Sequence, residues 1–398
     1  MTPRFARNLF AVLLWELLWG FGNACTSSAI FVTFLSQLAG SKRLVGTVGL
    51  TMLLGIPALL VSLWLAHRLR RKKVAVAILW AAQMVGWIVL GAVLRERTPD
   101  PRVVVPIVYV SQSVFAFLAG VSMAPTYELL TSVFGDRFGT AQGLQLLVRQ
   151  VSGVAGGLWA ASALSHDAFP RNFGMAFLVG GVALTASNAA VLLFDEVPRE
   201  TPPSTFVVDL KRTVREARPI ASLVWVIACA AFLVSAESLF PVSAIERLSL
   251  GDKYAGFFAS VTLAASGIGG ALAGAFGDRR GHARALVLSL VLQIAAFALA
   301  LRLLGLGQFY VALSLVGFAS AAMQINLAGL TAKLAPPGAS GAWMAIMRWL
   351  TQLVSALATA LVALLADRVG YTILFGACIL PVVFALFAAR AALRRERQ

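Results

Sequence analysis

Five ionisable side chains interrupt long apolar stretches of this chain, and they are the residues best suited to chemistry: Glu16, Glu128, Arg149, Glu237 and Arg348. A guanidinium offers several N–H donors in a fixed fork, so an arginine in such a place can bind a carboxylate or a phosphate. A carboxylate in apolar surroundings can load and release a proton. The pattern therefore predicts anion binding and proton transfer.

Covalent or metal chemistry is not expected from this sequence. The three histidines lie at the ends of apolar stretches, and the three cysteines lie far apart inside such stretches. A nucleophile, a base and an orienting group do not come together, and no His, Cys, Asp or Glu spacing fits a metal. We therefore expect no catalytic residue, no metal and no cofactor, and the chain is not expected to be an enzyme.

The composition requires a lipid environment. Hydrophobic residues make up 59% of the chain and charged residues 13%, and the apolar content runs from end to end. The net charge of +16 does not indicate nucleic-acid binding, because the Lys and Arg residues fall in short gaps between apolar blocks. The first block has no small-residue cleavage site and reads as a retained span rather than a signal peptide. The expected partners are the lipid bilayer, a small-molecule substrate and protons.

The apolar blocks predict an all-α membrane protein. A helix needs about twenty residues to cross the hydrocarbon core. By this rule the chain contains twelve spans, at residues 8–38, 44–66, 74–94, 103–132, 141–164, 172–194, 219–245, 254–276, 284–304, 308–333, 340–366 and 371–391.

One long polar, proline-rich connection divides the spans into two groups of six. We expect a six-helix bundle at 1–195, a cytoplasmic linker at 196–218 and a second bundle at 219–398. With the N-terminus inside, basic residues of the inner segments outnumber those of the outer segments by about two to one. Both termini are therefore predicted to be cytoplasmic, in a monomer of the cytoplasmic (inner) membrane.

The two halves resemble each other, as in transporters built from repeats. His67 and Arg68 follow the second span as Asp278 and Arg279 follow the eighth. Gly139 and Gly338 likewise open the fifth and eleventh spans, each ten residues before Arg149 or Arg348. This agreement predicts two pseudo-symmetric bundles.

Residues 274–284, which read GAFGDRRGHAR, resemble the signature that the major facilitator superfamily carries between the second and third spans of each half. The resemblance implies a secondary transporter that works by alternating access. It also implies that Asp278 faces the start of the eleventh span and latches the cytoplasmic gate. The latch residues would be Gly277, Asp278, Arg279, Gly281 and Arg284.

The N-terminal copy departs from that signature, because His67 stands at the acidic position and Arg70 at the second glycine. A symmetrical latch is therefore in doubt. The fourth span also lacks an arginine at 113–120, and the fifth keeps the glycines of 152–157 without a proline. Both departures weaken assignment to the drug/proton antiporters of the superfamily.

The depth of the buried charges suggests what they do. Ten helical residues from Gly139 or Gly338 place Arg149 and Arg348 about 15 Å below the surface, near mid-membrane. In the superfamily both spans line the contact between halves, so two converging guanidiniums would favour an anion. The alternative is that each arginine is neutralised within its own half: Glu128, about 12 Å deep, could reach Arg149, and Glu16 lies at a similar depth.

The carboxylates are the candidates for proton coupling. Glu237, near the helix-bending Pro241, is the first candidate, Glu16 the second, and Glu128 a further one. A structural hydrogen bond to a neighbouring helix is the alternative for each. Weaker candidates for substrate binding, for which holding helices together is the favoured reading, are Asn23, Tyr127, Gln145, Gln324, Asn326 and Gln352.

We therefore expect a secondary active transporter that is coupled to protons and moves a small solute, with an organic anion as the favoured class. An exporter of drugs or hydrophobic compounds is the alternative, supported by the aromatic first span around Trp15, Trp19 and Phe21. A membrane sensor or receptor without transport is the alternative from another class.

Overall fold

The computed structural model describes residues 3–39, 43–96, 100–134, 138–196, 235–301, 305–334 and 340–396. Within these ranges every regular element is a helix, because a backbone in lipid must satisfy its own hydrogen bonds. Nine helical stretches of the described chain are long and apolar enough to cross a membrane, and each matches an expected span. The linker at 197–218 and residues 219–234 of the expected seventh span lie outside the described residues.

The first six expected spans correspond to a continuous series of helices. The helices are α1 (Pro3–Cys25), α2 (Ser28–Ala39), α3 (Arg43–Gly49), η1 (Leu50–Leu54), α4 (Gly55–Arg68), α5 (Lys73–Glu96), α6 (Pro101–Phe134), α7 (Phe138–His166), α8 (Arg171–Ser187) and η3 (Asn188–Leu193). The second span combines α3, η1 and α4, and the sixth combines α8 and η3.

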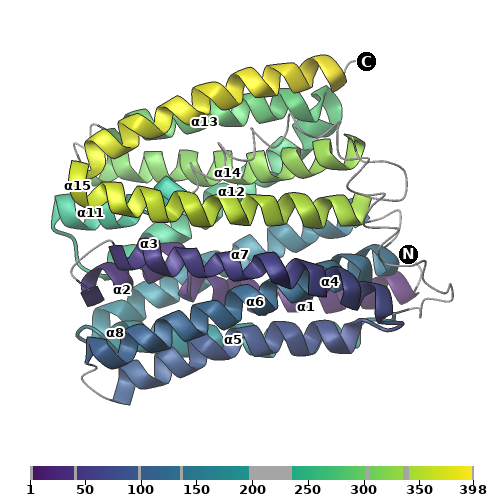
Figure 1. Ribbon diagram of the computed structural model, residues 1–398, viewed down its shortest axis with the longest axis horizontal. Coiled ribbons are helices and arrows are strands. Elements are labelled where there is room, and N and C mark those ends of the chain that lie inside the picture. The colour runs from purple at the N-terminus through teal and green to yellow at the C-terminus, as the bar shows by residue number, and fades with distance from the viewer. Residues whose placement is uncertain are drawn as a thin grey trace.

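The C-terminal part contains α11 (Phe240–Leu248), α12 (Lys253–Arg280), α13 (His282–Leu301), α14 (Leu306–Leu334) and α15 (Ser340–Glu396). The chain breaks its helix within α15 at Gly370, whose φ of 74° is a conformation that favours glycine. Two segments result, as expected for spans 340–366 and 371–391. In Figure 1 the green-to-yellow helices lie above the purple-to-blue ones, and both termini lie on the right.

The first and seventh spans are interrupted, although each was expected to be one continuous helix. The first breaks at Thr26 and Ser27, between α1 and α2. The seventh is helical at 235–237, turns at Ser238 and Leu239, and continues as α11. The short segments beyond the two breaks, α2 and α11, contact each other. The first spans of the two halves are thus both interrupted, and the segments beyond the two breaks meet.

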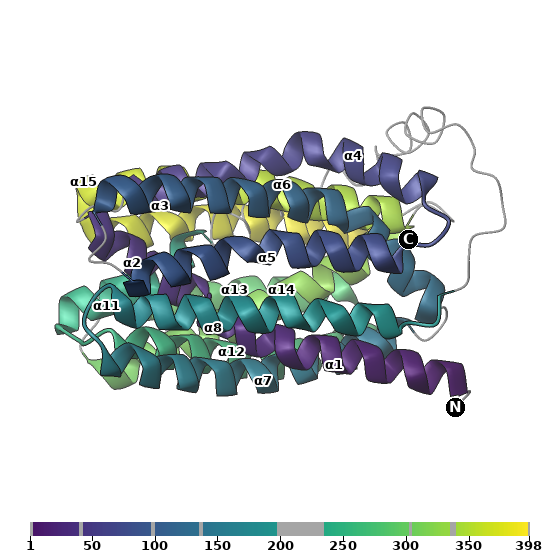
Figure 2. The same ribbon diagram turned by 90° about the horizontal axis from the view of Figure 1, so that it is seen from below.

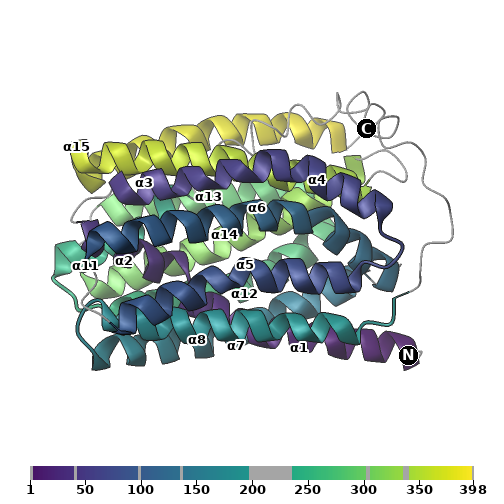
Figure 3. The same ribbon diagram turned by 60° about the horizontal axis from the view of Figure 1, so that its bottom comes forward.

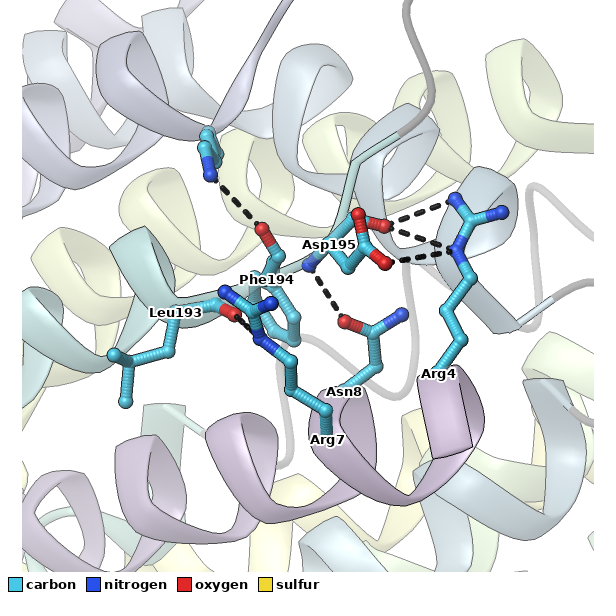
Figure 4. Close-up of polar contacts among 7 residues, drawn as sticks. Arg4, Arg7, Asn8, Leu193, Phe194 and Asp195 are labelled. Atoms are coloured by element: carbon cyan, nitrogen blue, oxygen red, sulfur yellow. Dashed lines mark hydrogen bonds and ion pairs between the residues drawn. The ribbon is translucent and has the colours of Figure 1, made fainter. Parts of the chain in front are cut away.

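At the end of the bundle that carries both termini, α1 holds the chain that leaves η3 (Figure 4). Arg4 donates to the Asp195 carbonyl oxygen at 2.9 Å, and Arg7 donates to the Leu193 carbonyl oxygen at 3.2 Å. The Asn8 side-chain oxygen accepts from the Asp195 backbone N–H at 2.7 Å. The two arginines satisfy carbonyl oxygens that the end of a helix leaves free, and Asn8 satisfies a backbone N–H. We call this the terminus end, and the opposite end, where α2 meets α11, the far end.

Candidate functional site

A buried ion pair joins α1 to α7. Arg149 Nη2 donates to Glu16 Oε1 at 2.6 Å, and Arg149 Nε donates to Glu16 Oε2. Gln145, one turn before Arg149, donates its Nε2 to Glu16 Oε1 at 3.2 Å. This two-bonded geometry is the strongest form of arginine–carboxylate contact. It occupies the Nε edge of the guanidinium and leaves Nη1 outside the pair.

Glycines bring the two helices close enough for this pair. A Cβ added at Gly20 would lie 2.1 Å from the Arg149 carbonyl oxygen, and one at Gly156 would lie 2.3 Å from the Phe21 carbonyl oxygen. Only residues without a side chain allow such an approach. Figure 2 shows α1 and α7 side by side. Because Gly20 lies one turn from Glu16, the close contact fixes the carboxylate opposite Arg149.

The ion pair is buried at its acidic end and accessible at its basic end. The Glu16 side chain is 2% exposed and the Arg149 side chain 40%. On α7, Gly153 and Gln150 lie against α12, whereas Leu147 and Val151 form an exposed apolar face. By helical spacing Arg149 lies between the faces that contact α1 and α12, and away from the apolar face. Its guanidinium is therefore directed between the two halves rather than toward lipid.

Glu128 does not reach Arg149, contrary to the expectation. Its carboxylate lies 3.3 Å from the ammonium of Lys72, the residue just before α5. Arg149 is neutralised within its own half, but by Glu16. Depth alone could not decide between the two carboxylates, because their rotation about the helix axis determines which neighbour each one meets.

Glu237 lies in a cluster of neutral polar groups from three spans. Gln293 of α13 donates its Nε2 to Glu237 Oε1 at 3.1 Å. Ser320 of α14 donates its hydroxyl to Glu237 Oε2 at 2.8 Å. The Gln293 Nε2 also lies 3.2 Å from the Ser320 hydroxyl oxygen. Both carboxylate oxygens thus accept a hydrogen bond, and neither donor carries a charge.

The weaker candidates for substrate binding divide into exposed and buried side chains. Asn23 and Gln324 are exposed within otherwise apolar helices, and Gln324 lies one turn after Ser320. Tyr127 is half-buried and lies within electrostatic range of Arg149. The side chains of Arg348 and Gln352 lie outside the part of the structure that is described.

Asn326 is a packing residue in this structure, so its expected contact with substrate is corrected. It is 0% exposed and donates to the carbonyl oxygens of Ala273 and Ala322. Its side-chain oxygen lies 3.0 Å from His282 Nδ1. These bonds join α12, α13 and α14, which is the alternative role weighed for the buried amides.

The signature at 274–284 forms the junction of α12 and α13. Gly281 has a φ of 96°, a conformation that favours glycine, and makes the turn between the two helices. Gly277 does not make a turn: it lies inside α12, where an added Cβ would meet Asn326 Oδ1 at 2.1 Å. Arg279 and Arg284 are exposed. The Asp278 side chain and residues 335–339, before the eleventh span, lie outside the described residues, so the latch stays a prediction.

One polar contact between the halves was not expected. Asp252, just before α12, accepts a hydrogen bond from Gln37 of α2 at 2.6 Å and another from Asn172 of α8 at 3.0 Å. The carboxylate thus joins three elements at the far end. These residues lie at helix ends, where polar residues are common, so nothing in the sequence marked them. Gln293 was also missed, although an amide inside an apolar span is a usable signal.

Comparisons with known proteins agree with this architecture. The family model described as Major Facilitator Superfamily matches residues 227–398. A search of curated proteins found no match. Among solved structures, the chain is similar to a bacterial homolog of the human lysosomal transporter Spinster in an inward-facing, unoccupied conformation (13% identity, TM-score 0.68, covering 99% of this chain and 98% of that one).

Two further solved structures are similar over nearly their full length. The D-xylose-proton symporter has 13% identity and a TM-score of 0.72, with 96% of this chain and 97% of that one covered. The human organic anion transporter MFSD10 has 14% identity and a TM-score of 0.66, with 98% and 100% covered. At this level of identity the likeness is one of fold. Together with the family match over residues 227–398, it shows that the chain has the all-helical, multi-pass membrane fold of the Major Facilitator Superfamily.

Proposed function

We propose that this transporter moves a small organic anion together with, or in exchange for, protons. The observation that carries the anion class is the Arg149 guanidinium, which is tethered on one edge by Glu16 and 40% exposed on the side between α1 and α12. A solute carboxylate could accept hydrogen bonds from the free Nη1 edge.

The pair carries no net charge, but its charges are not equally placed. Glu16 is buried among helices of the N-terminal half, and Arg149 lies between that carboxylate and the interface with α12. A solute approaching from the space between the halves therefore meets the positive end of the pair first. Coulomb attraction falls with distance, so the nearer guanidinium outweighs the carboxylate behind it.

Proton coupling is assigned to Glu237. The hydrogen-bond partners of its carboxylate in the described part of the chain are the neutral Gln293 and Ser320. Because a charge inside a membrane is costly, uptake of a proton changes the free energy of this cluster strongly. A carboxylate whose charge must be gained and lost in each cycle suits a driving ion that is released on one side.

The solved relatives do not choose the solute. Their names refer to an organic anion, to D-xylose with a proton, to nucleosides and to peptides. All share the fold at 13–14% identity. The anion class therefore rests on Arg149.

We also propose the expected organisation: bundles at 1–195 and 219–398, a linker at 196–218, and cytoplasmic termini. Support for the orientation comes from the terminus end, where Arg4, Arg7, Arg68, Arg70 and Arg71 gather. Labelling of single exposed cysteines from either side of sealed vesicles would test it. Labelling of an Arg70→Cys variant only from the outside of cells would contradict it.

Exchange across proteoliposomes tests the anion class. A panel of mono- and dicarboxylates is compared with the corresponding neutral amides, in wild type, Arg149→Gln and an exposed control, Arg102→Gln. We expect Arg149→Gln to reduce exchange of the carboxylates at least about tenfold, because one charge-assisted bond is worth about 1.5–3 kcal/mol. Arg102→Gln should behave as wild type. Carboxylate exchange that survives in Arg149→Gln would rule out the anion proposal.

A further inference from the structure

We infer that Gln293 and Ser320 are positioning residues for Glu237, which together favour its ionised form in this conformation and set the pH at which it takes up a proton. This inference rests on the proposed coupling role of Glu237. It concerns how the site is tuned, and nothing in the family match or in the solved relatives assigns these two residues.

The direction of the hydrogen bonds carries the argument. An ionised carboxylate is an acceptor only, and both of its oxygens are served here, by Gln293 Nε2 at 3.1 Å and by Ser320 Oγ at 2.8 Å. The Gln293 amide also faces the Ser320 hydroxyl oxygen at 3.2 Å. The Gln293 Nε2 thus faces an oxygen atom on both contacts, an orientation that suits an ionised carboxylate, which has no proton to donate to an amide oxygen.

That orientation leaves the other end of the amide without a partner. Gln293 is 0% exposed, and its Oε1 has no hydrogen-bond partner within the described residues. A buried acceptor without a donor is costly. The cluster therefore satisfies the carboxylate at the expense of Gln293, which is the expected arrangement when the carboxylate is ionised.

Other titratable groups near Glu237 do not replace these donors. The second segment of α15 brings the Cys378 thiol within electrostatic range of the carboxylate, and this thiol is buried. From α13 and α14 the facing groups are Gln293 and Ser320. Among the described residues no basic side chain pairs with Glu237, so the two neutral donors carry the stabilisation of its charge.

The sign of the effect follows. Removing a donor to the ionised form weakens that form relative to the protonated one, so the proton is held to a higher pH. One hydrogen bond to a charged group corresponds to about one pH unit. We expect Gln293→Met and Ser320→Ala each to raise the midpoint of Glu237 protonation by about one unit.

The measurement is pH-difference infrared spectroscopy of the full-length protein in lipid bilayers. The carboxyl C=O band that is absent from Glu237→Gln identifies Glu237, and no substrate is needed. Gln83→Met is the matched control: Gln83 lies in the third span, as Gln293 lies in the ninth, and it is 1% exposed with no partner for either amide atom in the described part of the chain. It should leave the midpoint unchanged.

Two variants keep the test decisive. Ser320→Ala removes only one oxygen atom, so it should fold even if Gln293→Met fails to fold. Midpoints that stay at the wild-type value or move down, or a Glu237 band that never titrates, would overturn the inference. Failure of the proposed function gives a different result. In that case Glu237→Gln would still accumulate solute under a pH gradient, independently of the midpoints measured by infrared spectroscopy.

Discussion

Arg149 shows how a membrane protein can keep a cation available inside an apolar helix. Its Nε edge is held by Glu16, which is almost fully buried, and its remaining edge is accessible. A free arginine in this place would turn toward the nearest water or headgroup. The fixed carboxylate prevents this and orients the fork, at the cost of cancelling the net charge. Glu16 is thus a positioning partner for Arg149 in the proposed site.

A double-mutant cycle tests this coupling. We expect Glu16→Gln to lower the free energy of unfolding by about 2 kcal/mol, below the 3–5 kcal/mol of a fully buried pair because Arg149 is partly exposed. Once Arg149→Gln is present, Glu16→Gln should cost much less, giving a coupling energy of about 1–3 kcal/mol. Denaturant unfolding of the purified protein measures this coupling energy.

Asp195→Asn, in the exposed Arg4–Asp195 pair, is the control and should lower the free energy of unfolding by less than about 1 kcal/mol. Additive effects of the two substitutions would contradict the pairing.

At the level of single residues, the sequence alone could not identify which carboxylate pairs with Arg149. Counting residues along helices predicted similar depths for Glu16, Glu128 and Arg149, and Glu16 does contact Arg149. Pairing depends in addition on rotation about each axis and on which helices are neighbours, and neither can be read from one span. Glu128, considered as a partner of Arg149, pairs with Lys72 instead, while the alternative of a pair within one half agrees with the Glu16–Arg149 contact.

At the scale of elements, glycines determine how closely helices approach. The contact of α1 with α7 depends on Gly20 and Gly156, and the contact of α7 with α12 depends on Gly157 and Gly256. In each case an added Cβ would lie less than 3.0 Å from an atom of the neighbouring helix. The first contact sets the Glu16–Arg149 pair, and the second joins the two halves.

Gly20→Ala is the sharpest test of the first contact. The new methyl group must push α1 away from α7, so we expect a loss of about 1–3 kcal/mol in the free energy of unfolding. Exchange of carboxylates should fall too, because Glu16 moves away from Arg149. Gly305→Ala is the control, since an added Cβ there meets nothing within 4 Å. Equal stability of the two variants would show that α1 and α7 are not packed in this way.

Helices as units were largely predictable, and their interruptions were not. Length and apolar content identify a span because lipid leaves few alternatives for the backbone. The breaks at Thr26–Ser27 and Ser238–Leu239 lie at polar residues within otherwise apolar spans, and Pro241 follows the second, but such residues also occur inside unbroken spans. They are set by packing: α2 and α11, beyond the two breaks, meet each other across the halves. The turn at Gly281, by contrast, followed from a glycine at a helix end.

At the scale of the whole molecule, the far end joins the two halves by polar and apolar contacts. Asp252 accepts hydrogen bonds from Gln37 and Asn172, and α3 packs against α15 (Figure 3). A transporter that works by alternating access must separate contacts of this kind in every cycle. The contacts should therefore be strong enough to close the end, yet few enough to open again.

Cross-linking the far end tests whether it opens during transport. A Cβ added at Gly46 of α3 would lie 3.0 Å from the Cβ of Ala363 in α15, close to the roughly 3.5–4.5 Å separation found in disulfides. We expect Gly46→Cys with Ala363→Cys to form a disulfide on oxidation and to lose transport, with recovery on reduction. Each single variant, oxidised in the same way, controls for the native cysteines. Full transport by the cross-linked protein would mean that the far end stays closed throughout the cycle, and that the solute does not pass between α3 and α15.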